Sequence, residues 1–254
     1  MKMKSVEKRP YVLTLAGFDP SGGAGLTADI KAFEALKVYG LAVCTANTVQ
    51  NDTEFQSCHW TDIDVMKNQI DILFKRFTID VVKIGIVENW GVLNQLLDIV
   101  LVKNSEIKII LDPVLSSSSN FSFHNNLFEF DEVLGKVYLL TPNFNEIQTL
   151  YPEKTIEATL KLISNSTNIL LKGGHRKDSV GQDNLFLTDG THIIFEPFNK
   201  NCFEKHGSGC VLSSAIAGYL ALGSGLEEAC RKGKQYIETF LTSNESLLGY
   251  HQQY

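Results

Sequence analysis

Short hydrophobic runs alternate along the chain with longer segments in which hydrophobic positions recur every three or four residues. The first pattern is typical of buried strands, and the second is typical of helices that pack on a sheet. The alternation predicts an α/β fold with a central, mostly parallel sheet and helices on both of its faces. The predicted strands cover residues 11–17, 41–47, 80–86, 108–114, 137–143 and 168–174.

The segment 184–197 differs from the rest because its two apolar runs are joined directly through Asp189 and Gly190. An Asp-Gly pair favours a tight turn, so we expect a hairpin at the edge of the sheet. No repeat, low-complexity linker or run of charge divides the sequence, which predicts a single domain over residues 1–254. The serine-rich stretch 116–126 is typical of a surface loop.

Composition narrows the function classes. A chain of 254 residues that is 44% hydrophobic can bury a large core. The net charge of −6 argues against nucleic-acid binding, which needs a basic face. No apolar run reaches the ~20 residues that span a bilayer, so we expect no membrane partner. The cysteines are odd in number and scattered, which favours a reducing cytoplasm; they are Cys44, Cys58, Cys202, Cys210 and Cys230.

The stretch "AGFDPSGGAGLTADI" (16–30) forms a first glycine-rich loop after a predicted strand. Its part 19–22 fits a type I turn, which is a purely structural explanation. Its part 23–25 is more open than a turn requires, so a ligand can approach the backbone. The loop matches neither a Walker loop nor the dinucleotide fingerprint. The helix that follows is expected to bury Leu26, Ile30, Phe33 and Leu36.

A second glycine-rich loop, "KHGSGC" (205–210), precedes an apolar helix. The free amides and the dipole at a helix N-terminus form an anion site, and Gly207 and Gly209 let a phosphate come close. A thiol at this position is expected to have a lowered pKa, so Cys210 is a candidate base. A simple Gly-Ser cap and a buried structural cysteine are the alternatives. The helix is expected to bury Val211, Leu212, Ala215, Ile216, Tyr219 and Leu220.

Three further strand ends carry polar side chains, and open α/β sheets bind ligands at the carboxyl ends of their strands. Asp112 offers a carboxylate for Mg²⁺. Asn143 and Glu146 are three residues apart at a helix start, which places both oxygens on one side; a capping pair is the alternative. Lys172 closes an apolar strand, where an uncompensated charge is costly.

These motifs occur together in a recognisable order. They read "AGFDPSGGAGLTADIKAFEAL", "VYG", "NTVQND", "KIGI", "LDPV", "TPNFNE", "LLKGGH" and "HGSGC". From about residue 11 to residue 232 the sequence resembles the hydroxymethylpyrimidine/phosphomethylpyrimidine kinases of thiamine synthesis, members of the ribokinase-like superfamily. The resemblance implies ATP- and Mg²⁺-dependent phosphorylation of 4-amino-5-hydroxymethyl-2-methylpyrimidine and of its monophosphate, by a homodimer.

The resemblance also implies roles for individual residues. Gly17 and Asp29 would lie in the pyrimidine pocket, and Gln50 would hydrogen-bond the aminopyrimidine, whose amine and ring nitrogen an amide can pair with. Cys210 would be the base. The remaining implied positions are the anion hole at Gly207, Ser208 and Gly209, the metal site at Asp112 and Glu146, and the nucleotide site at Asn143, Glu146 and Lys172.

The sequence departs from the resemblance in two segments. The stretch 116–123 replaces a usual Lys/Ser-Gly element, and the C-terminal "SNESLLGYHQQY" replaces a glycine-proline segment. Ile86 stands where methionine is usual, which is a volume-tolerant exchange. Two alternatives therefore remain open: a pyridoxal kinase of the same fold, and a non-catalytic protein that binds a nucleotide or a vitamer.

Overall fold

The computed structural model describes residues 8–115, 130–174, 180–199 and 201–252; the predicted loop at 116–126 lies outside them. The strands are β1 Tyr11–Phe18, β2 Tyr39–Gln50, β3 Phe55–Trp60, β4 Ile79–Ile84, β5 Lys108–Leu111, β6 Leu139–Leu140, β7 Asn168–Leu171, β8 Asp183–Phe186 and β9 His192–Phe195. The helices are α1 Gly25–Ala35, α2 Ile63–Arg76, α3 Trp90–Lys103, α4 Asp131–Leu134, α5 Phe144–Leu150, α6 Ile156–Ser164, α7 Ser208–Ala221 and α8 Leu226–Leu241.

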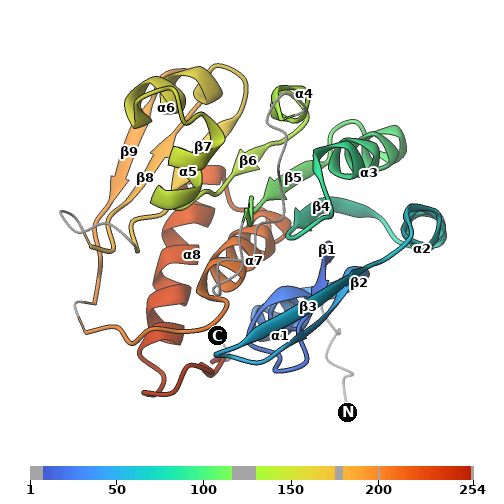
Figure 1. Ribbon diagram of the computed structural model, residues 1–254, viewed down its shortest axis with the longest axis horizontal. Coiled ribbons are helices and arrows are strands. Elements are labelled where there is room, and N and C mark those ends of the chain that lie inside the picture. Colours follow the sequence, from blue (N-terminus) through green and yellow to red (C-terminus); the bar gives the residue numbers. More distant parts are fainter. Residues whose placement is uncertain (1–7, 116–129, 175–179, 200, 253–254) are drawn as a thin grey trace, which may run out of the picture.

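The described strands form one nine-stranded sheet in the order β3-β2-β1-β4-β5-β6-β7-β8-β9 (Figure 1). Strands β1, β2 and β4 to β7 are parallel, whereas β3, β8 and β9 pair antiparallel with their neighbours. The mostly parallel sheet and the edge hairpin are therefore confirmed. The strand order turns back at β1, which has β2 on one side and β4 on the other, and such a switch point opens a crevice at the carboxyl ends of the strands.

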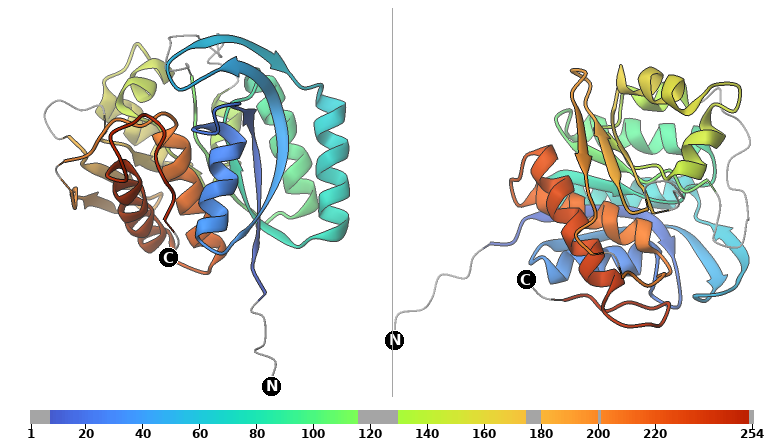
Figure 2. Two further views of the ribbon diagram at one scale, coloured as in Figure 1. Left: turned by 90° about the horizontal axis from the view of Figure 1, so that it is seen from below. Right: turned by 90° about the vertical axis from the view of Figure 1, so that its left-hand side faces the viewer.

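Side chains of successive strand residues point to opposite faces, so each strand serves two cores. Val12 and Ile110 pack with α1, α7 and α8, whereas Leu13 and Ile109 pack with α2 to α6. Figure 2 shows these two helical layers on opposite sides of the sheet. Burial on both faces explains why the strands read as continuous apolar runs.

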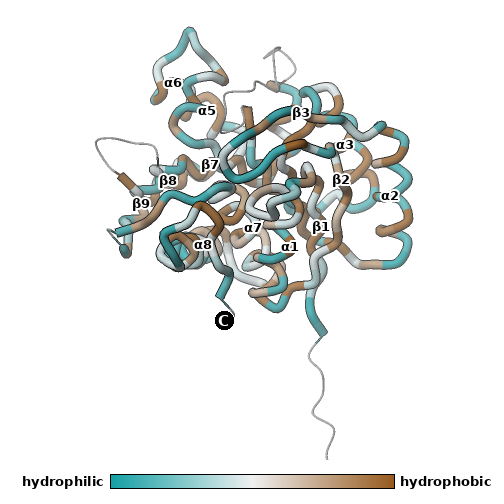
Figure 3. Tube along the Cα trace, turned by 60° about the horizontal axis from the view of Figure 1, so that its bottom comes forward, coloured by the Kyte–Doolittle hydropathy of each residue, from teal (hydrophilic) through white to brown (hydrophobic). Residues whose placement is uncertain are grey.

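Helix α7 lies between α1 and α8, and the trace of α2 carries both hydrophilic and hydrophobic residues (Figure 3). The expected apolar residues of α7 are buried, except that Tyr219 is half-buried. In α1, Phe33 and Leu36 are buried as expected, while Leu26 and Ile30 are only half-buried. None of the helices that the described residues form has the length and apolar character that crossing a membrane requires.

Strand β3 is an element that the hydrophobic pattern did not predict. Its sequence, FQSCHW, is half polar, which suits a strand at the sheet edge, where the side chains stay partly exposed. The turn before it is built by Asn51, whose side chain accepts hydrogen bonds from the backbone N–H groups of Thr53 and Glu54 at 2.8 Å. Strand β2 therefore runs to Gln50, three residues beyond the predicted end.

A fully buried ion pair joins the central elements. The Nζ atom of Lys83 on β4 lies 2.9 Å from Oδ2 of Asp29 on α1, and both side chains are 0% exposed. Thr14 of β1 and Ser214 of α7 each donate a hydrogen bond of 2.6 Å to the same carboxylate. Burial opposes the charge of Lys83, but the attraction of Asp29 outweighs it and holds the pKa of Lys83 above its usual value.

Replacing Lys83 with methionine is expected to lower the free energy of unfolding by about 3–5 kcal/mol, because Asp29 is left buried without a counter-charge. Chemical denaturation measures this change. The matched control is the double variant Lys83→Met/Asp29→Asn, which removes both charges and should recover a large part of the loss. A single variant as stable as the wild type would show that the pair does not anchor the core.

Candidate active site

The two glycine-rich loops touch each other through their backbones. Gly207 takes a left-handed φ of 72° directly before α7, and a Cβ atom on it would lie 2.1 Å from the carbonyl oxygen of Gly23. Gly25 has a φ of 60°, and a Cβ atom there would lie 2.1 Å from the carbonyl oxygen of Gly17. Because a side chain at Gly207 or Gly25 would collide with main chain, this approach requires glycine.

The first loop opens with the predicted turn, in which the N–H of Gly22 donates to the carbonyl oxygen of Asp19 at 3.0 Å. The Asp19 side chain then accepts hydrogen bonds of 2.8 Å from the hydroxyl of Ser21 and from the N–H of Ala24. The structural explanation of residues 19–22 is therefore confirmed. The second loop leads into α7, whose N-terminus receives no hydrogen bond from a described side chain at its cap.

A compact charged cluster lies beside the start of α7. Lys172, which follows β7, has its Nζ atom 2.7 Å from Oδ1 of Asp112 and 3.9 Å from Oε2 of Glu146. The hydroxyl of Ser213 on α7 lies 3.3 Å from Oδ2 of Asp112. A Cβ atom on Gly209 would lie 3.2 Å from Nζ of Lys172. The side chains of Lys172, Asp112 and Glu146 thus meet beside the first turn of α7. The sequence predicted such polar groups at the carboxyl ends of the strands.

Asn143 and Glu146 form a capping box at the start of α5. The Asn143 side chain accepts from the N–H of Glu146 at 2.9 Å, and the Glu146 carboxylate accepts from the N–H of Asn143 at 2.6 Å. The capping interpretation is therefore confirmed, and the oxygen that accepts from Asn143, Oε2 of Glu146, is also the one that lies 3.9 Å from Nζ of Lys172.

Burial shapes the ionisation of this cluster. It raises the pKa of Glu146 to about 7, against the opposing attraction of Lys172. For Lys172 burial favours the neutral form, but the carboxylates of Asp112 and Glu146 outweigh it and raise the pKa of the amine. Lys172 therefore stays cationic in a desolvated position, where charges act strongly on a ligand.

The chemical state of Cys210 corrects an expectation. Burial raises the pKa of this thiol to about 11; Lys83 and the N–H of Gly25 act in the opposite direction, while Asp112 and Asp29 add to the rise. The prediction of a lowered pKa at the helix N-terminus was therefore wrong. Desolvation disfavours the thiolate more than the partial charge of the helix end favours it.

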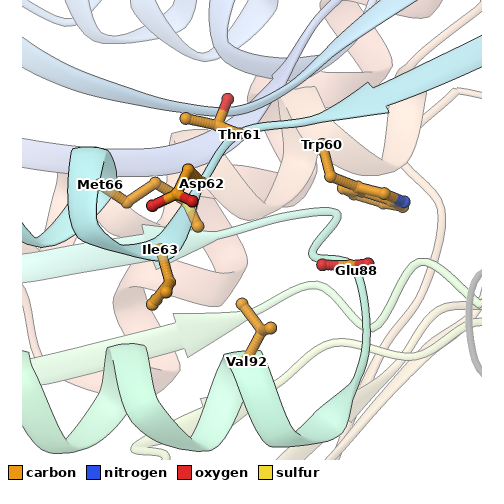
Figure 4. Close-up of a pocket in the computed structure, with 7 residues that line it drawn as sticks. All are labelled: Trp60, Thr61, Asp62, Ile63, Met66, Glu88 and Val92. Atoms are coloured by element: carbon orange, nitrogen blue, oxygen red, sulfur yellow. The ribbon is translucent and has the colours of Figure 1, made fainter.

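A pocket of about 390 Å³ lies elsewhere, between the start of α2 and the start of α3 (Figure 4). It is lined by Trp60, Thr61, Asp62, Ile63, Met66, Glu88 and Val92. None of these belongs to the predicted site. Asp62 also has a structural task, because its carboxylate caps α2 by accepting from the N–H of Asp64. This pocket therefore carries none of the predicted chemistry.

The donor set beside α7 fits Mg²⁺. Asp112 and Glu146 offer hard carboxylate oxygens, and Mg²⁺ is commonly held by one or two carboxylates together with substrate phosphates and water. Within the described part of the chain, no group of three or more His, Cys, Asp or Glu side chains could hold a metal ion. The remaining ligands would come from phosphate oxygens and water.

Comparison with known proteins assigns the chain to a family. The profile of the family described as phosphomethylpyrimidine kinase matches residues 19–253. The hydroxymethylpyrimidine/phosphomethylpyrimidine kinase of Escherichia coli (strain K12) is 31% identical over 263 residues, which cover 94% of each protein. The chain belongs to the phosphomethylpyrimidine kinase family.

Solved structures agree with this assignment. The phosphomethylpyrimidine kinase of Clostridium difficile 630 matches with a TM-score of 0.75 at 30% identity, over 90% of this chain and 98% of that one. The pyridoxal kinase of Staphylococcus aureus in complex with ADP matches with a TM-score of 0.81 at 22% identity, over 93% and 89% of the two chains. The fold is thus the ribokinase-like one that the sequence predicted.

The residues that the family resemblance assigns to the pyrimidine pocket lie in different environments. Asp29 is fully buried, and its carboxylate is occupied by the internal donors described above, so the structure does not present it to a substrate. Gln50 is half-buried at the end of β2 and donates to the hydroxyl of Thr48 at 2.8 Å. That hydroxyl donates to the carbonyl oxygen of Phe18, directly after Gly17. The Gln50 side chain is thus linked through Thr48 to the residue that follows Gly17, whereas Asp29 lies in the core.

Sequence reasoning missed several residues of the site. Lys83 is the one charged residue inside the apolar run VVKIGI, and a charge in a buried strand signals a partner. Ser213 and Ser214 interrupt an otherwise apolar helix, and each contacts a buried carboxylate. His206 stands in the HGSGC motif and bonds Asp19, but no local pattern announces that partner.

The raised pKa of Cys210 predicts that its alkylation by iodoacetamide keeps accelerating above about pH 9, because only the thiolate reacts. Mass spectrometry of the Cys210 peptide measures the rate at each pH. Protein unfolded in urea is the control, and its rate should level off near the ordinary cysteine pKa of ~8.5. A plateau in the folded protein at or below that of the control would contradict the desolvation argument.

Proposed function

We propose that this protein transfers the γ-phosphoryl group of ATP to 4-amino-5-hydroxymethyl-2-methylpyrimidine and to the monophosphate of that pyrimidine, in thiamine synthesis. The observation that carries the proposal is the convergence of Lys172, Asp112 and Glu146 on the glycine-preceded N-terminus of α7. The cytoplasmic location that the cysteines favour and the homodimer that the family resemblance implies belong to the same proposal. Family membership supports it, since the relatives named above are kinases of this type.

The phosphoryl side of the site provides positioning and charge neutralisation. Transfer passes through a loose transition state, so catalysis depends on donors and cations that are already in place. Lys172 and the first-turn amides of α7 would contact the phosphate oxygens. Asp112 and Glu146 would hold Mg²⁺, which would neutralise part of the charge of the phosphate groups.

The acceptor side consists of the first glycine loop, Gln50 and Cys210. Gln50 would pair with the amine and ring nitrogen of the pyrimidine. Cys210 would contact the hydroxymethyl oxygen in its thiol form, because its pKa is about 11. A loose transition state develops little bonding to the attacking oxygen, so a strong base is not required. The monophosphate acceptor already carries a reactive anionic oxygen.

One experiment tests the proposal and its alternatives. ADP release with ATP and Mg²⁺ is measured for three acceptors: the hydroxymethylpyrimidine, its monophosphate and pyridoxal. We expect kcat/KM for the two pyrimidines to exceed that for pyridoxal by roughly tenfold or more, because unpaired buried polar groups penalise the wrong ring. Faster transfer to pyridoxal would favour the pyridoxal kinase alternative. Binding of ATP and acceptor without transfer would favour the non-catalytic alternative.

The substitution Gln50→Leu is expected to weaken pyrimidine binding by about 1–3 kcal/mol, a roughly 5- to 150-fold rise in Kd, because ring polar groups lose their partner. Isothermal titration measures the pyrimidine and ATP affinities separately. ATP affinity should stay within about twofold, since Lys172 and Asp112 are untouched. Thr48→Val is the matched control, because it removes the internal partner of Gln50 but keeps the amide. Unchanged pyrimidine affinity in Gln50→Leu would exclude Gln50 as the recognition residue.

A further inference from the structure

Asp19 and His206 form a buried pair that the proposed chemistry does not use. The Nε2 atom of His206 lies 3.0 Å from Oδ2 of Asp19, although 187 residues separate the two in sequence. The His206 side chain is 7% exposed and the Asp19 side chain is 1% exposed. Burying a carboxylate is costly unless hydrogen bonds compensate it. The turn that Asp19 opens does not by itself account for a buried partner from the second loop, so the pair is a candidate for a further function.

On the acceptor side, Asp19 holds the whole first loop. Besides its bonds to the Ser21 hydroxyl and the Ala24 N–H, its Oδ1 atom accepts from the N–H of Ser21 at 2.8 Å. These bonds, together with the one from His206, overcome the effect of burial and lower the pKa of Asp19 to about 2. The loop leads directly into Gly25, whose backbone N–H points to the sulfur of Cys210.

On the phosphoryl side, His206 immediately precedes Gly207 and the first turn of α7. Its main chain is held by the C-terminal segment, because its N–H donates to the carbonyl oxygen of Leu247 at 2.9 Å. The amine of Lys205 donates to the carbonyl oxygens of Asn244 and Ser246 at 2.5 and 2.7 Å. The C-terminal segment, which departs from the family pattern, thus holds the main chain at His206 in place.

We propose that Asp19 and His206 are positioning residues that hold the acceptor-side loop and the N-terminus of α7 at the separation that phosphoryl transfer requires. Where the loops meet, Gly207 lies against the carbonyl oxygen of Gly23, and the imidazole ring of His206 lies against Gly23. The Asp19–His206 hydrogen bond provides a direct side-chain link between them. The inference rests on the proposed function, since it assigns one loop to the acceptor and the other to the phosphate.

The test compares two amides at position 206. In His206→Gln the side-chain nitrogen can reach the place of the ring Nε2 atom, whereas in His206→Asn it reaches only the place of Nδ1. We expect kcat for the hydroxymethylpyrimidine to fall roughly ten- to a hundredfold in His206→Asn, because small misplacements of reacting groups are costly. KM for ATP and for the pyrimidine should stay within about twofold. His206→Gln should keep kcat within about threefold of the wild type.

A readout independent of turnover accompanies the kinetics. Release of the first loop would expose the half-buried Cys210 further, so its alkylation rate at fixed pH should rise in His206→Asn and return to the wild-type rate in His206→Gln. His192→Asn is the matched control, because His192 Nε2 also lies 3.0 Å from its partner, the Oδ1 atom of Asn184 on the distant hairpin. This control should change neither kcat nor the alkylation rate.

The outcomes separate the two proposals. Equal kcat and equal alkylation in His206→Gln and His206→Asn would overturn the positioning role, as would a rise in both KM values without a change in kcat. If the wild-type protein phosphorylates none of the three acceptors, the proposed function fails. The alkylation series then still decides whether the pair holds the two loops together.

Discussion

The buried ion pair between Asp29 and Lys83 is the constraint on which the rest of the site depends. Its carboxylate also receives hydrogen bonds from Thr14 and Ser214, so it joins β1, α1, β4 and α7 at one point. A buried charge tolerates little displacement of its partners, because each lost contact leaves it unsatisfied. Both glycine-rich loops begin or end on these four elements. The ion pair thus helps to fix where the two loops contact each other and where Cys210 lies.

At the candidate active site, desolvation sets the protonation states of the titratable side chains. It raises the pKa of Cys210 to about 11 and that of Glu146 to about 7, while the carboxylates beside Lys172 keep that amine charged. Such a site is poorly suited to strong base catalysis. It is well suited to a reaction in which preorganised positive charge meets a polyphosphate, because fixed charges act more strongly where water is excluded.

The C-terminal segment departs from the family pattern in sequence but is packed into the fold. The sequence departs from the family resemblance there, yet residues 243–252 pack against α8 and the second glycine-rich loop. The Tyr236 hydroxyl lies 2.8 Å from Nδ1 of His251, and Gly249 lies against the ring of Phe240, where a Cβ atom would approach within 2.6 Å. The segment supports the first glycine loop through His206, and the side chain of Leu248 also lies against Gly23.

The sequence by itself determined the α/β architecture, the edge hairpin, the two glycine-rich loops and the strand ends that bear Asp112 and Lys172. These features follow from local periodicity and from the rule that parallel strands share one carboxyl edge. Only the tertiary structure decided that β3 pairs at the edge, that Asp29 points into the core, and that the thiol of Cys210 keeps its proton. Each depends on neighbours distant in sequence, and desolvation is a property of the surrounding atoms rather than of the residue or its helix position.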